Sequence, residues 1–433
     1  MPLKHTVEEI VLDNGIKGLL IDVPDATVVS YSIYFRAGFS YADPNIHETP
    51  HLMEHMVASG INDRFIKKGD YDEEFTKNGA YKNAITSETR MTYIAESAVM
   101  EYDRIIDLMH LTLTRPTFTE TLLDAEKRTI KEELSIYLNN NIRVAYQCNA
   151  KAMGVLQTDG LEQIELIDNV KLSDIEDCYY KHYTLNNMRF VLVGDLKLKR
   201  QQIIDRFQTF NLPEGNRLPT LKATAKRSSA VKLDKDTHNL TYGIEISINR
   251  LMSQSERIAI NIVNHILTGT FNSRIFGEAR KRGICYRINS YASVQQMQYS
   301  SWRFFGEVGQ NNIVELFQLV ADQIKLLLDK GISEDDLVRE KQYFIGNYQM
   351  KGQTVGNLSE WYAMPYYDYD EILSLDKYSE LVNSITTNDI TNIVVDFIKT
   401  NIWCLSVIGM LSDDDLKLYE SIVAQAFDDG GVK

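Results

Sequence analysis

The sequence has few cysteines, a deficit of basic residues and no long apolar run. Its four cysteines lie far apart and form no C-x-x-C pair, which argues against a disulfide framework or a thiolate metal site. The formal net charge of −14 argues against nucleic-acid or anionic-membrane partners, because both attract clustered Lys and Arg. No apolar run approaches a membrane span, and the first residues contain no apolar signal segment. We therefore expect a soluble, cytoplasmic protein that binds neither nucleic acid nor membrane.

A chain of 433 residues exceeds what one hydrophobic core usually organises, so we expect at least two domains. A weak internal repeat with an offset of 215 residues supports two similarly built halves. Residues 174–194 and 389–409 both read as a helix followed by a buried strand that ends at glycine. We predict an N-terminal domain over 1–212, a turn-rich linker over 213–229 and a C-terminal domain over 230–433.

Strand-like and helix-like patterns are grouped separately within each half. Residues 26–35 and 240–248 are rich in β-branched and aromatic side chains, which is typical of sheet strands. Residues 100–113 and 312–328 carry apolar side chains at every third or fourth position, which predicts helices. We therefore predict an α+β fold with two similar halves, each a mostly antiparallel sheet with helices packed on it.

The stretch H-L-M-E-H at residues 51–55 carries the clearest chemical signal. His51 and His55 are four residues apart, so on a helix both imidazoles point the same way and can hold one metal ion. Pro50 suits the first turn of such a helix. Glu54 lies at the edge of the same face, where its carboxylate can take a proton from an attacking water without being a ligand. A catalytic zinc site needs a third protein ligand and an open position.

A helix predicted over 119–138 offers that third ligand. Glu126 and Glu133 share one otherwise apolar stripe of the helix, and burying two carboxylates there would be costly without a cation. Glu132 is turned about 100° away from Glu133, where exposed pairing is a sufficient explanation for it. We predict that Glu133, with the two histidines, holds one zinc ion per chain. The alternative is a helix that carries two buried, purely structural histidines.

These residues resemble the inverted zinc motif H-x-x-E-H of the inverzincins, and more specifically the pitrilysin/insulinase family, which includes the mitochondrial processing peptidase. Residues 35–41 resemble the strand and turn that precede the motif in that family, and residues 78–87 resemble its G-A-x-x-N-A-x-T strand. Residues 126–134 resemble its second zinc helix. In the second half, residues 272–276 and 283–286 resemble its S-R-L-F and G-L-x-Y stretches. The resemblance spans nearly the whole chain.

The resemblance implies a zinc-dependent endopeptidase that hydrolyses peptides or small unfolded proteins. It implies that Glu126 supports catalysis from outside the ligand set, by orienting a histidine or balancing charge. An extended substrate would lie beside Asn83 and Ala84, added as a strand. Arg280 and Tyr286, from the metal-free half, would contact the substrate. Family members of this length typically pair, so we expect a homodimer or a heterodimer with a related subunit.

The sequence departs from the family pattern in two places. Residues 48–50, Glu-Thr-Pro, replace the small, glycine-containing lead-in that usually precedes the first histidine. Residues 279–283 are one residue shorter than one common form of the family pattern. Two other functions stay open. One is a non-catalytic subunit that binds substrate or scaffolds an active relative. The other is a dedicated protease that processes one precursor or leader peptide.

Overall fold

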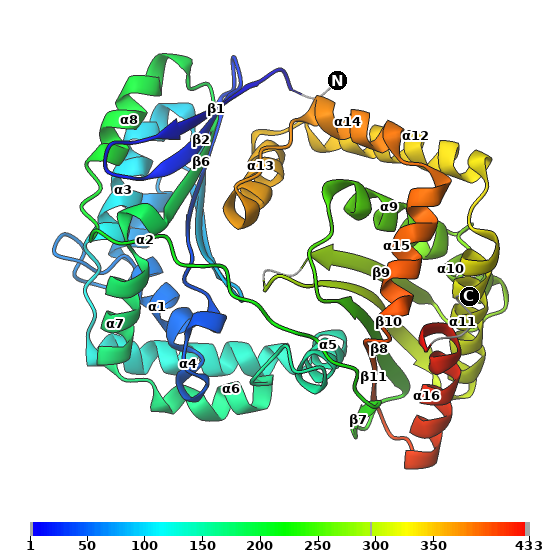
Figure 1. The fold of residues 1–433 in the computed structure, drawn as a ribbon. Coiled ribbons are helices and arrows are strands. Elements are labelled where there is room, and N and C mark those ends of the chain that lie inside the picture. The colour runs from blue at the N-terminus through cyan, green and yellow to red at the C-terminus, as the bar shows by residue number, and fades with distance from the viewer. Residues whose placement is uncertain (1–2, 295–296, 429–433) are drawn as a thin grey trace. The chain divides into compact units, whose positions relative to one another are not determined.

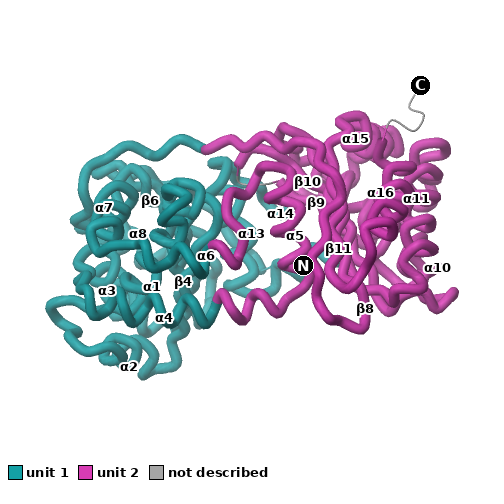
Figure 2. The backbone as a smooth tube through the Cα atoms, turned by 90° about the horizontal axis from the view of Figure 1, so that it is seen from below, with its two compact units in different colours: residues 1–133, 163–220, 347–375 teal, residues 134–162, 221–346, 376–433 magenta. Residues whose placement is uncertain are grey.

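A computed structural model describes residues 3–294 and 297–428, which form two compact units (Figures 1 and 2). Unit 1 comprises residues 1–133, 163–220 and 347–375, and unit 2 comprises residues 134–162, 221–346 and 376–433. Each unit therefore contains one segment from the opposite half of the chain. The predicted linker at 213–229 divides the chain into two continuous halves and stays a prediction. The compact units differ from those halves, because each unit is made of several separate segments.

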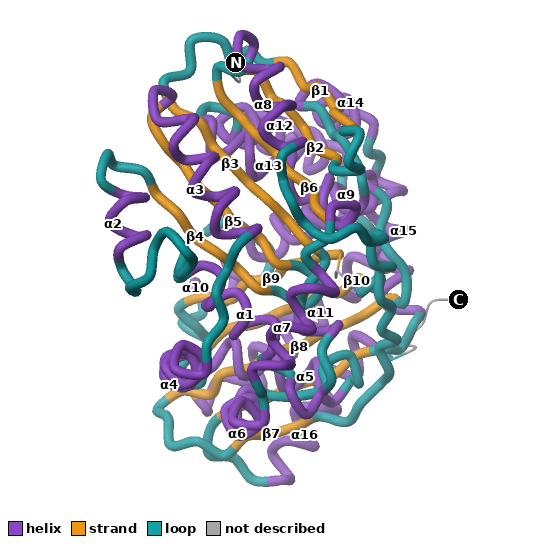
Figure 3. Tube along the Cα trace, turned by 90° about the vertical axis from the view of Figure 1, so that its left-hand side faces the viewer, coloured by secondary structure: helices purple, strands orange, loops and turns teal. Residues whose placement is uncertain are grey.

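Unit 1 is built on a six-stranded sheet in the order β1-β2-β6-β3-β5-β4. Neighbouring strands are antiparallel, except β2 and β6, which run parallel. No described strand pairs with the outer edge of β4, which borders the sheet beside β5 (Figure 3). The strands are β1 (Thr6–Val11), β2 (Lys17–Asp22), β3 (Val28–Phe35), β4 (Tyr81–Thr86), β5 (Met91–Ala98) and β6 (Met188–Gly194).

Helices cover both faces of this sheet, which is why β6 is buried along its whole length and β3 along nearly all of it. α1 and α3 lie on one face, and α13 lies on the other (Figure 1). The helices of the unit are α1 (Thr49–Ala58), α2 (Asp70–Thr76), α3 (Tyr102–Thr114), α7 (Leu172–His182), α8 (Arg200–Gln208) and α13 (Val355–Tyr369). Two further helices belong partly to each unit, namely α4 (Glu120–Tyr137) and α6 (Gly160–Leu166).

Unit 2 repeats the same strand order in a five-stranded sheet, β7-β11-β8-β10-β9. β7 and β11 run parallel and the other pairs are antiparallel, as in the β2-β6-β3-β5-β4 part of unit 1. The strands are β7 (Val231–Leu233), β8 (Asn239–Ile248), β9 (Arg287–Val294), β10 (Ser300–Gly309) and β11 (Trp403–Ile408). The prediction of two similar halves, each a mostly antiparallel sheet with helices, is confirmed.

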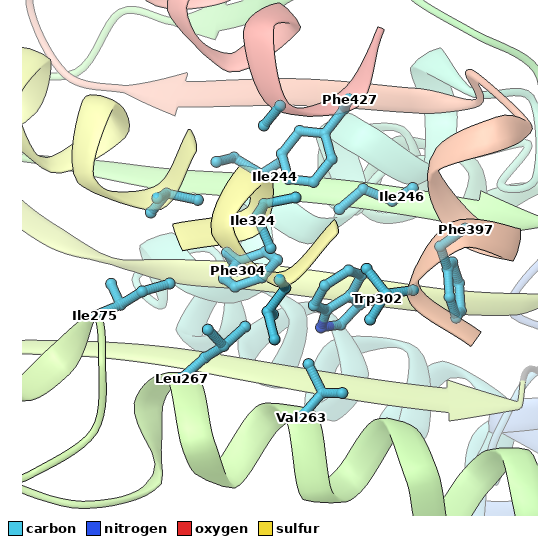
Figure 4. Packing of buried hydrophobic residues seen from close by; sticks show 14 of the residues in the cluster. Ile244, Ile246, Val263, Leu267, Ile275, Trp302, Phe304, Ile324, Phe397 and Phe427 are labelled. Atoms are coloured by element: carbon cyan, nitrogen blue, oxygen red, sulfur yellow. The ribbon is translucent and has the colours of Figure 1, made fainter. Parts of the chain in front are cut away.

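One face of the second sheet carries α5, and the other carries α9, α11, α15 and α16 (Figure 1). Between that second face and its helices lies an apolar core, with Trp302 and Phe304 of β10 at its centre, packed by Phe397 and Phe427 (Figure 4). The helices are α5 (Asn141–Ala152), α9 (Gln254–Asn264), the π-helix η7 (His265–Gly269), α10 (Phe276–Lys281), α11 (Ile313–Lys330), α12 (Glu334–Lys351), α14 (Leu375–Ser384), α15 (Thr387–Lys399) and α16 (Asp413–Phe427).

The predicted elements agree with the observed ones to within a few residues. The strands expected at 26–35 and 240–248 are β3 and β8, and the helix expected at 119–138 is α4. The repeat offset also holds, since β6 shifted by 215 residues falls on 403–409, where β11 lies. Within the described part of the chain, no helix is long and apolar enough to cross a membrane.

Candidate metal centre

Helix α1 presents two histidines on one side. It begins at Thr49 with Pro50 in its first turn, as expected for a residue that lacks an N–H. Leu52 and Met56 are fully buried and anchor the helix in the unit. One turn apart, the rings of His51 and His55 have centroids 4.8 Å apart and planes at 85° to each other. The four-residue spacing therefore places both rings together, as the sequence predicts.

Glu133 of α4 reaches the same point as the two histidines. Its Oε2 lies 3.7 Å from Nε2 of His51 and 3.6 Å from Nε2 of His55. The three ligand atoms all lie within 4.8 Å of one another. Tetrahedral zinc with bonds of 2.0–2.2 Å separates its ligands by roughly 3.3–3.5 Å, so the two distances from Glu133 are already close to those around a bound ion. Glu132, the neighbouring acid, is exposed to solvent.

A carboxylate holds the other nitrogen of each ring. Glu126 Oε2 lies 3.1 Å from Nδ1 of His55, and Glu48 Oε2 lies 2.9 Å from Nδ1 of His51. A carboxylate accepts a hydrogen bond from Nδ1–H, which leaves Nε2 with its lone pair directed towards a metal. Glu126 occupies the supporting place that the family resemblance implies. The sequence pattern did not single out Glu48.

Hydrogen bonds set the protonation of Glu48. Its burial raises the pKa, but hydrogen bonds from His47 and His51 outweigh burial and hold the pKa at about 2. Burial lowers the pKa of His51. The hydrogen bond to Glu48 and the negative charge of Glu48 raise it by more, so the pKa of His51 lies above its usual value. Protons and a metal compete for the same ring, so metal binding weakens as the pH falls.

Lys68 supports Glu126 from the segment between α1 and α2. Lys68 Nζ lies 2.5 Å from Glu126 Oε1, and the carboxylate is 3% exposed. Burial raises the pKa of Glu126, while hydrogen bonds from His55 and Lys68 bring it below its usual value. The charge of Lys68 therefore helps to keep this buried carboxylate ionised beside its histidine.

Glu54 lies beside the edge strand β4. Thr86, the last residue of β4, donates a hydrogen bond of 2.6 Å to Oε2 of the buried Glu54. A cavity of about 570 Å³ opens at this place, and Asn83 and Ala84 of β4 contribute to its wall. The same cavity is lined by Glu54, His55 and Glu126. The structure thus brings the predicted base, one histidine ligand and the predicted substrate strand together in unit 1.

Arg280 and Tyr286 form a separate cluster within unit 2. The guanidinium carbon of Arg280 lies 5.1 Å from the ring centroids of both Phe271 and Tyr286. Its Nη1 also donates to the backbone oxygen of Tyr286 at 3.3 Å. Because the Tyr286 side chain is 81% exposed, the cluster is open to solvent. A role for these two residues in binding substrate stays a prediction.

Sequence reasoning missed the roles of three residues of the centre, Glu48, Lys68 and Thr86. Glu48 precedes His51 by three residues, and that helical spacing was the one available signal for it. Thr86 ends the G-A-x-x-N-A-x-T strand at residues 78–87, but that pattern gave it no role beside Glu54. Lys68 comes from a segment that no spacing along the chain relates to the metal motif. Only the folded arrangement reveals that Lys68 holds Glu126 and that Thr86 holds Glu54.

Comparison with known proteins places the chain in a family. The family model described as "Insulinase (Peptidase family M16)" matches residues 18–157, and the one described as "Peptidase M16 inactive domain" matches residues 169–344. The solved structure of a protease from Helicobacter pylori superimposes with a TM-score of 0.84 at 17% identity. The match covers 95% of this chain and 100% of that one. This likeness shows that the two chains share a fold.

Two relatives with different names match most of the chain. An "uncharacterized zinc protease" of Rickettsia felis is 22% identical over 411 residues, which covers 92% of this chain and 96% of that protein. A "non-peptidase homolog" of Helicobacter pylori is 24% identical over 382 residues, which covers 85% and 84%. Two domain models of one family match successive stretches that together cover most of the chain, so the chain belongs to the insulinase family of peptidases, peptidase family M16.

Proposed function

We propose that this protein is a zinc-dependent endopeptidase in which His51, His55 and Glu133 hold one zinc ion per chain. The convergence of two imidazole Nε2 atoms on one carboxylate oxygen carries this proposal. Two nitrogen ligands and one oxygen ligand form a set that zinc accepts in catalytic sites, where a fourth position is left open. The name of the Rickettsia relative, a zinc protease, also supports the metal.

The proposed reaction is the hydrolysis of a peptide bond. Zinc, when bound, supplies polarisation of the scissile carbonyl and a more acidic attacking water. Glu54 takes a proton from that water and delivers it to the nitrogen of the leaving amine. The hydrogen bond from Thr86 fixes Oε2 of Glu54, so we assign the proton transfer to Oε1. Glu126 keeps His55 in the tautomer whose Nε2 is a ligand.

The substrate would bind as an added strand at the outer edge of β4, next to Asn83 and Ala84. The wall of the adjoining cavity is largely apolar, with Phe75, Met109 and Leu113 among its residues. We therefore propose that an apolar side chain next to the scissile bond enters the cavity. Strand addition requires an extended chain, so the substrates would be peptides or small unfolded proteins.

We further propose that Arg280 and Tyr286 of unit 2 contact the substrate and that the chain acts as a dimer. The resemblance to paired family members of similar length supports the dimer, either of two copies or with a related subunit. Light scattering on the purified chain, alone and with a candidate subunit, measures the mass of the assembly directly. Cleavage of one precursor or leader peptide is the narrower form of the same function.

A non-catalytic substrate-binding or scaffold subunit is the alternative, since the Helicobacter relative is named a non-peptidase homolog. Against that reading, His51, His55, Glu54 and Glu133 are all present here and the three ligand groups converge. The two functions differ in one measurable property, because a scaffold hydrolyses no peptide even when its metal residues are intact.

Glu54→Gln tests the proposal, with Glu132→Gln as a matched control on the exposed neighbour of Glu133. We expect the wild type to bind one zinc and to cleave a quenched fluorescent peptide mixture. Glu54→Gln should keep its zinc and lose hydrolysis by about 10²- to 10⁴-fold, the usual contribution of a general base. Glu132→Gln should match the wild type. Hydrolysis that survives Glu54→Gln would refute the mechanism, and a wild type without zinc or hydrolysis would favour the scaffold.

A further inference from the structure

We propose that Glu48 is a positioning residue for the metal, whose carboxylate fixes the His51 ring with Nε2 directed at the ion. It would do for His51 what Glu126 does for His55. This inference rests on the proposed function, because it requires a metal at His51. Glu48 belongs to the stretch at residues 48–50 that replaces the small, glycine-containing lead-in usual before the first histidine.

Both oxygens of Glu48 are used by histidines. Oε2 lies 2.9 Å from Nδ1 of His51, Oε1 lies 2.9 Å from Nδ1 of His47, and the carboxylate side chain is 1% exposed. Glu48 is the N-cap residue of α1, yet its side chain makes no capping hydrogen bond. A buried carboxylate is costly unless its hydrogen bonds are satisfied. Helix capping therefore does not explain why the Glu48 carboxylate is buried here, whereas its contacts with the two imidazoles do.

The chemistry of the pair fixes a tautomer as well as a position. A neutral imidazole carries one N–H, and an ionised carboxylate only accepts hydrogen bonds. The contact with Glu48 therefore places the hydrogen of His51 on Nδ1 and leaves the lone pair on Nε2. That nitrogen is the one that lies 3.7 Å from Glu133. Without the carboxylate, the ring could protonate Nε2 instead and cease to be a ligand.

Neighbouring rings hold this arrangement in place. The ring of Phe39 stacks on that of His47, with centroids 4.8 Å apart and planes at 6°, and meets His51 edge-on at 6.0 Å. Gly38 allows the close approach of this loop, since a Cβ there would lie 2.2 Å from the backbone oxygen of Ser87. The carboxylate is thus held by His47 as well as by His51, and the His47 ring is itself packed against Phe39. The Glu48 carboxylate is therefore already in position to orient the His51 ring.

The decisive measurement is the zinc affinity of Glu48→Gln, obtained by competition with a chromogenic chelator. The amide has nearly the same shape but can donate to Nδ1 of His51, which permits the wrong tautomer. We expect the Kd for zinc to rise about 10- to 100-fold, the usual cost of losing such an outer partner. The visible absorption bands of the cobalt-substituted protein should also shift, because they report the geometry of the ligands rather than the stability of the fold.

His47→Asn is the matched control, because it leaves the contact between Glu48 and His51 in place. Its Kd should change by much less than the roughly 10-fold lower limit expected for Glu48→Gln. Glu48→Asp keeps the charge but withdraws it by one methylene, so its Kd should lie between those of the wild type and Glu48→Gln. This variant also serves if Glu48→Gln does not fold.

Three results would overturn the assignment. One is a zinc affinity and cobalt spectrum of Glu48→Gln equal to those of the wild type. Another is an equal loss in Glu48→Gln and His47→Asn, because the effect would then belong to the packing of the whole network. A Glu48→Asp variant that binds zinc more weakly than Glu48→Gln would do the same. A wild type that binds no zinc refutes the proposed function together with this inference, whereas the first three results leave that function intact.

Discussion

Each unit contains a histidine in contact with a glutamate. The histidine lies on the helix that follows a long buried strand (β3 or β8), and the glutamate lies on a later, longer helix. In unit 1 the distance from His55 Nδ1 to Glu126 Oε2 is 3.1 Å. In unit 2 the distance from His265 Nδ1 to Glu340 Oε2 is 2.6 Å. The histidines lie near the ends of the corresponding helices α1 and α9–η7, and the glutamates lie on α4 and α12. A histidine–carboxylate pair is therefore common to both halves and does not itself define a metal site.

The two halves differ in the residues that stand at the corresponding spacings along the chain from that pair. Asn261 and Asn264 precede His265 by four residues and one residue, the spacings of the proposed first ligand and the proposed general base in unit 1. Asn347, the first residue of the segment that the second half gives to unit 1, follows Glu340 by seven residues, the spacing of the proposed third ligand. Asparagine supplies neither an imidazole nor a carboxylate charge. The comparison predicts that equivalent substitutions in the two units affect different properties of the protein.

Exchanging the two corresponding histidines for glutamine should give the largest difference. His55→Gln removes a ligand, so we expect zinc binding to fall by more than the roughly 10- to 100-fold cost of an outer partner and hydrolysis to be abolished. His265→Gln should leave one zinc per chain and unchanged hydrolysis. Zinc content by mass spectrometry and peptide cleavage measure both effects. Loss of zinc in His265→Gln would contradict the separation of roles.

The residues of the candidate site that are related by helical spacing could be predicted from the sequence. The convergence of His51, His55 and Glu133 follows from residues four apart on one helix and from an acidic stripe on another. Glu48 was missed because it lies just outside the five-residue motif, and only the structure shows that its carboxylate faces His47 and His51. Lys68 reaches the centre through tertiary packing, which no spacing in the sequence records.

Periodicity predicted the elements but not which sheet each helix covers. α5 and α13 carry buried residues that mark them as packed helices, but a pattern of burial does not identify the packing partner. In the structure α5 lies on β8 and β11, and α13 lies on β3 and β6. Each half of the chain therefore gives one helix to the opposite unit. Such an exchange follows from long-range contacts that a linear reading does not contain.

The two exchanged helices are anchored by different chemistry, which predicts unequal losses of stability. Arg90 Nη1 and Asp368 Oδ2 of α13 lie 2.7 Å apart, and each side chain is 12% exposed. Asp368→Ala leaves the arginine buried without its partner, so we expect a loss of about 3–5 kcal/mol in the free energy of unfolding. Asn149 of α5 donates a neutral hydrogen bond to the backbone oxygen of Gly243. Asn149→Ala should cost only about 1 kcal/mol.

Urea unfolding followed by circular dichroism measures both losses. The control variant Asp376→Ala replaces an exposed acid on the first turn of α14 and should change the free energy of unfolding by no more than about 0.5 kcal/mol, as surface substitutions usually do. Equal losses for Asp368→Ala and Asn149→Ala would show that the charged pair anchors α13 no more strongly than a neutral hydrogen bond anchors α5.

Acid should weaken unit 1 through His182, which is 2% exposed. Burial lowers the pKa of His182 to about 4, although its Nδ1 bonds to the backbone oxygen of Arg36. The unfolded chain, with a pKa near 6.5, takes up the proton first as the pH falls. Stability from the neutral ring is therefore complete above about pH 6.5 and is lost towards pH 4, by up to about 3 kcal/mol.

His182→Gln isolates this contribution, because glutamine can still bond to the Arg36 oxygen but does not titrate. We expect the variant to lose less unfolding free energy than the wild type between pH 7 and pH 4.5. Parallel pH profiles of the two proteins would show that His182 does not set the acid sensitivity of unit 1.

The glutamates of the two pairs provide the finest test, since one substitution should change metal binding and the other only stability. Glu126→Gln keeps the shape of the side chain but permits His55 to carry its hydrogen on Nε2, so we expect the zinc Kd to rise about 10- to 100-fold. Glu340→Gln should leave that Kd unchanged and lower the free energy of unfolding by about 1 kcal/mol, the usual worth of one hydrogen bond. Chelator competition measures the zinc Kd of both variants, and urea unfolding measures their free energies of unfolding. If Glu340→Gln also weakened zinc, the second unit would contribute to the metal centre through its own histidine–carboxylate pair, and the two halves would not be independent.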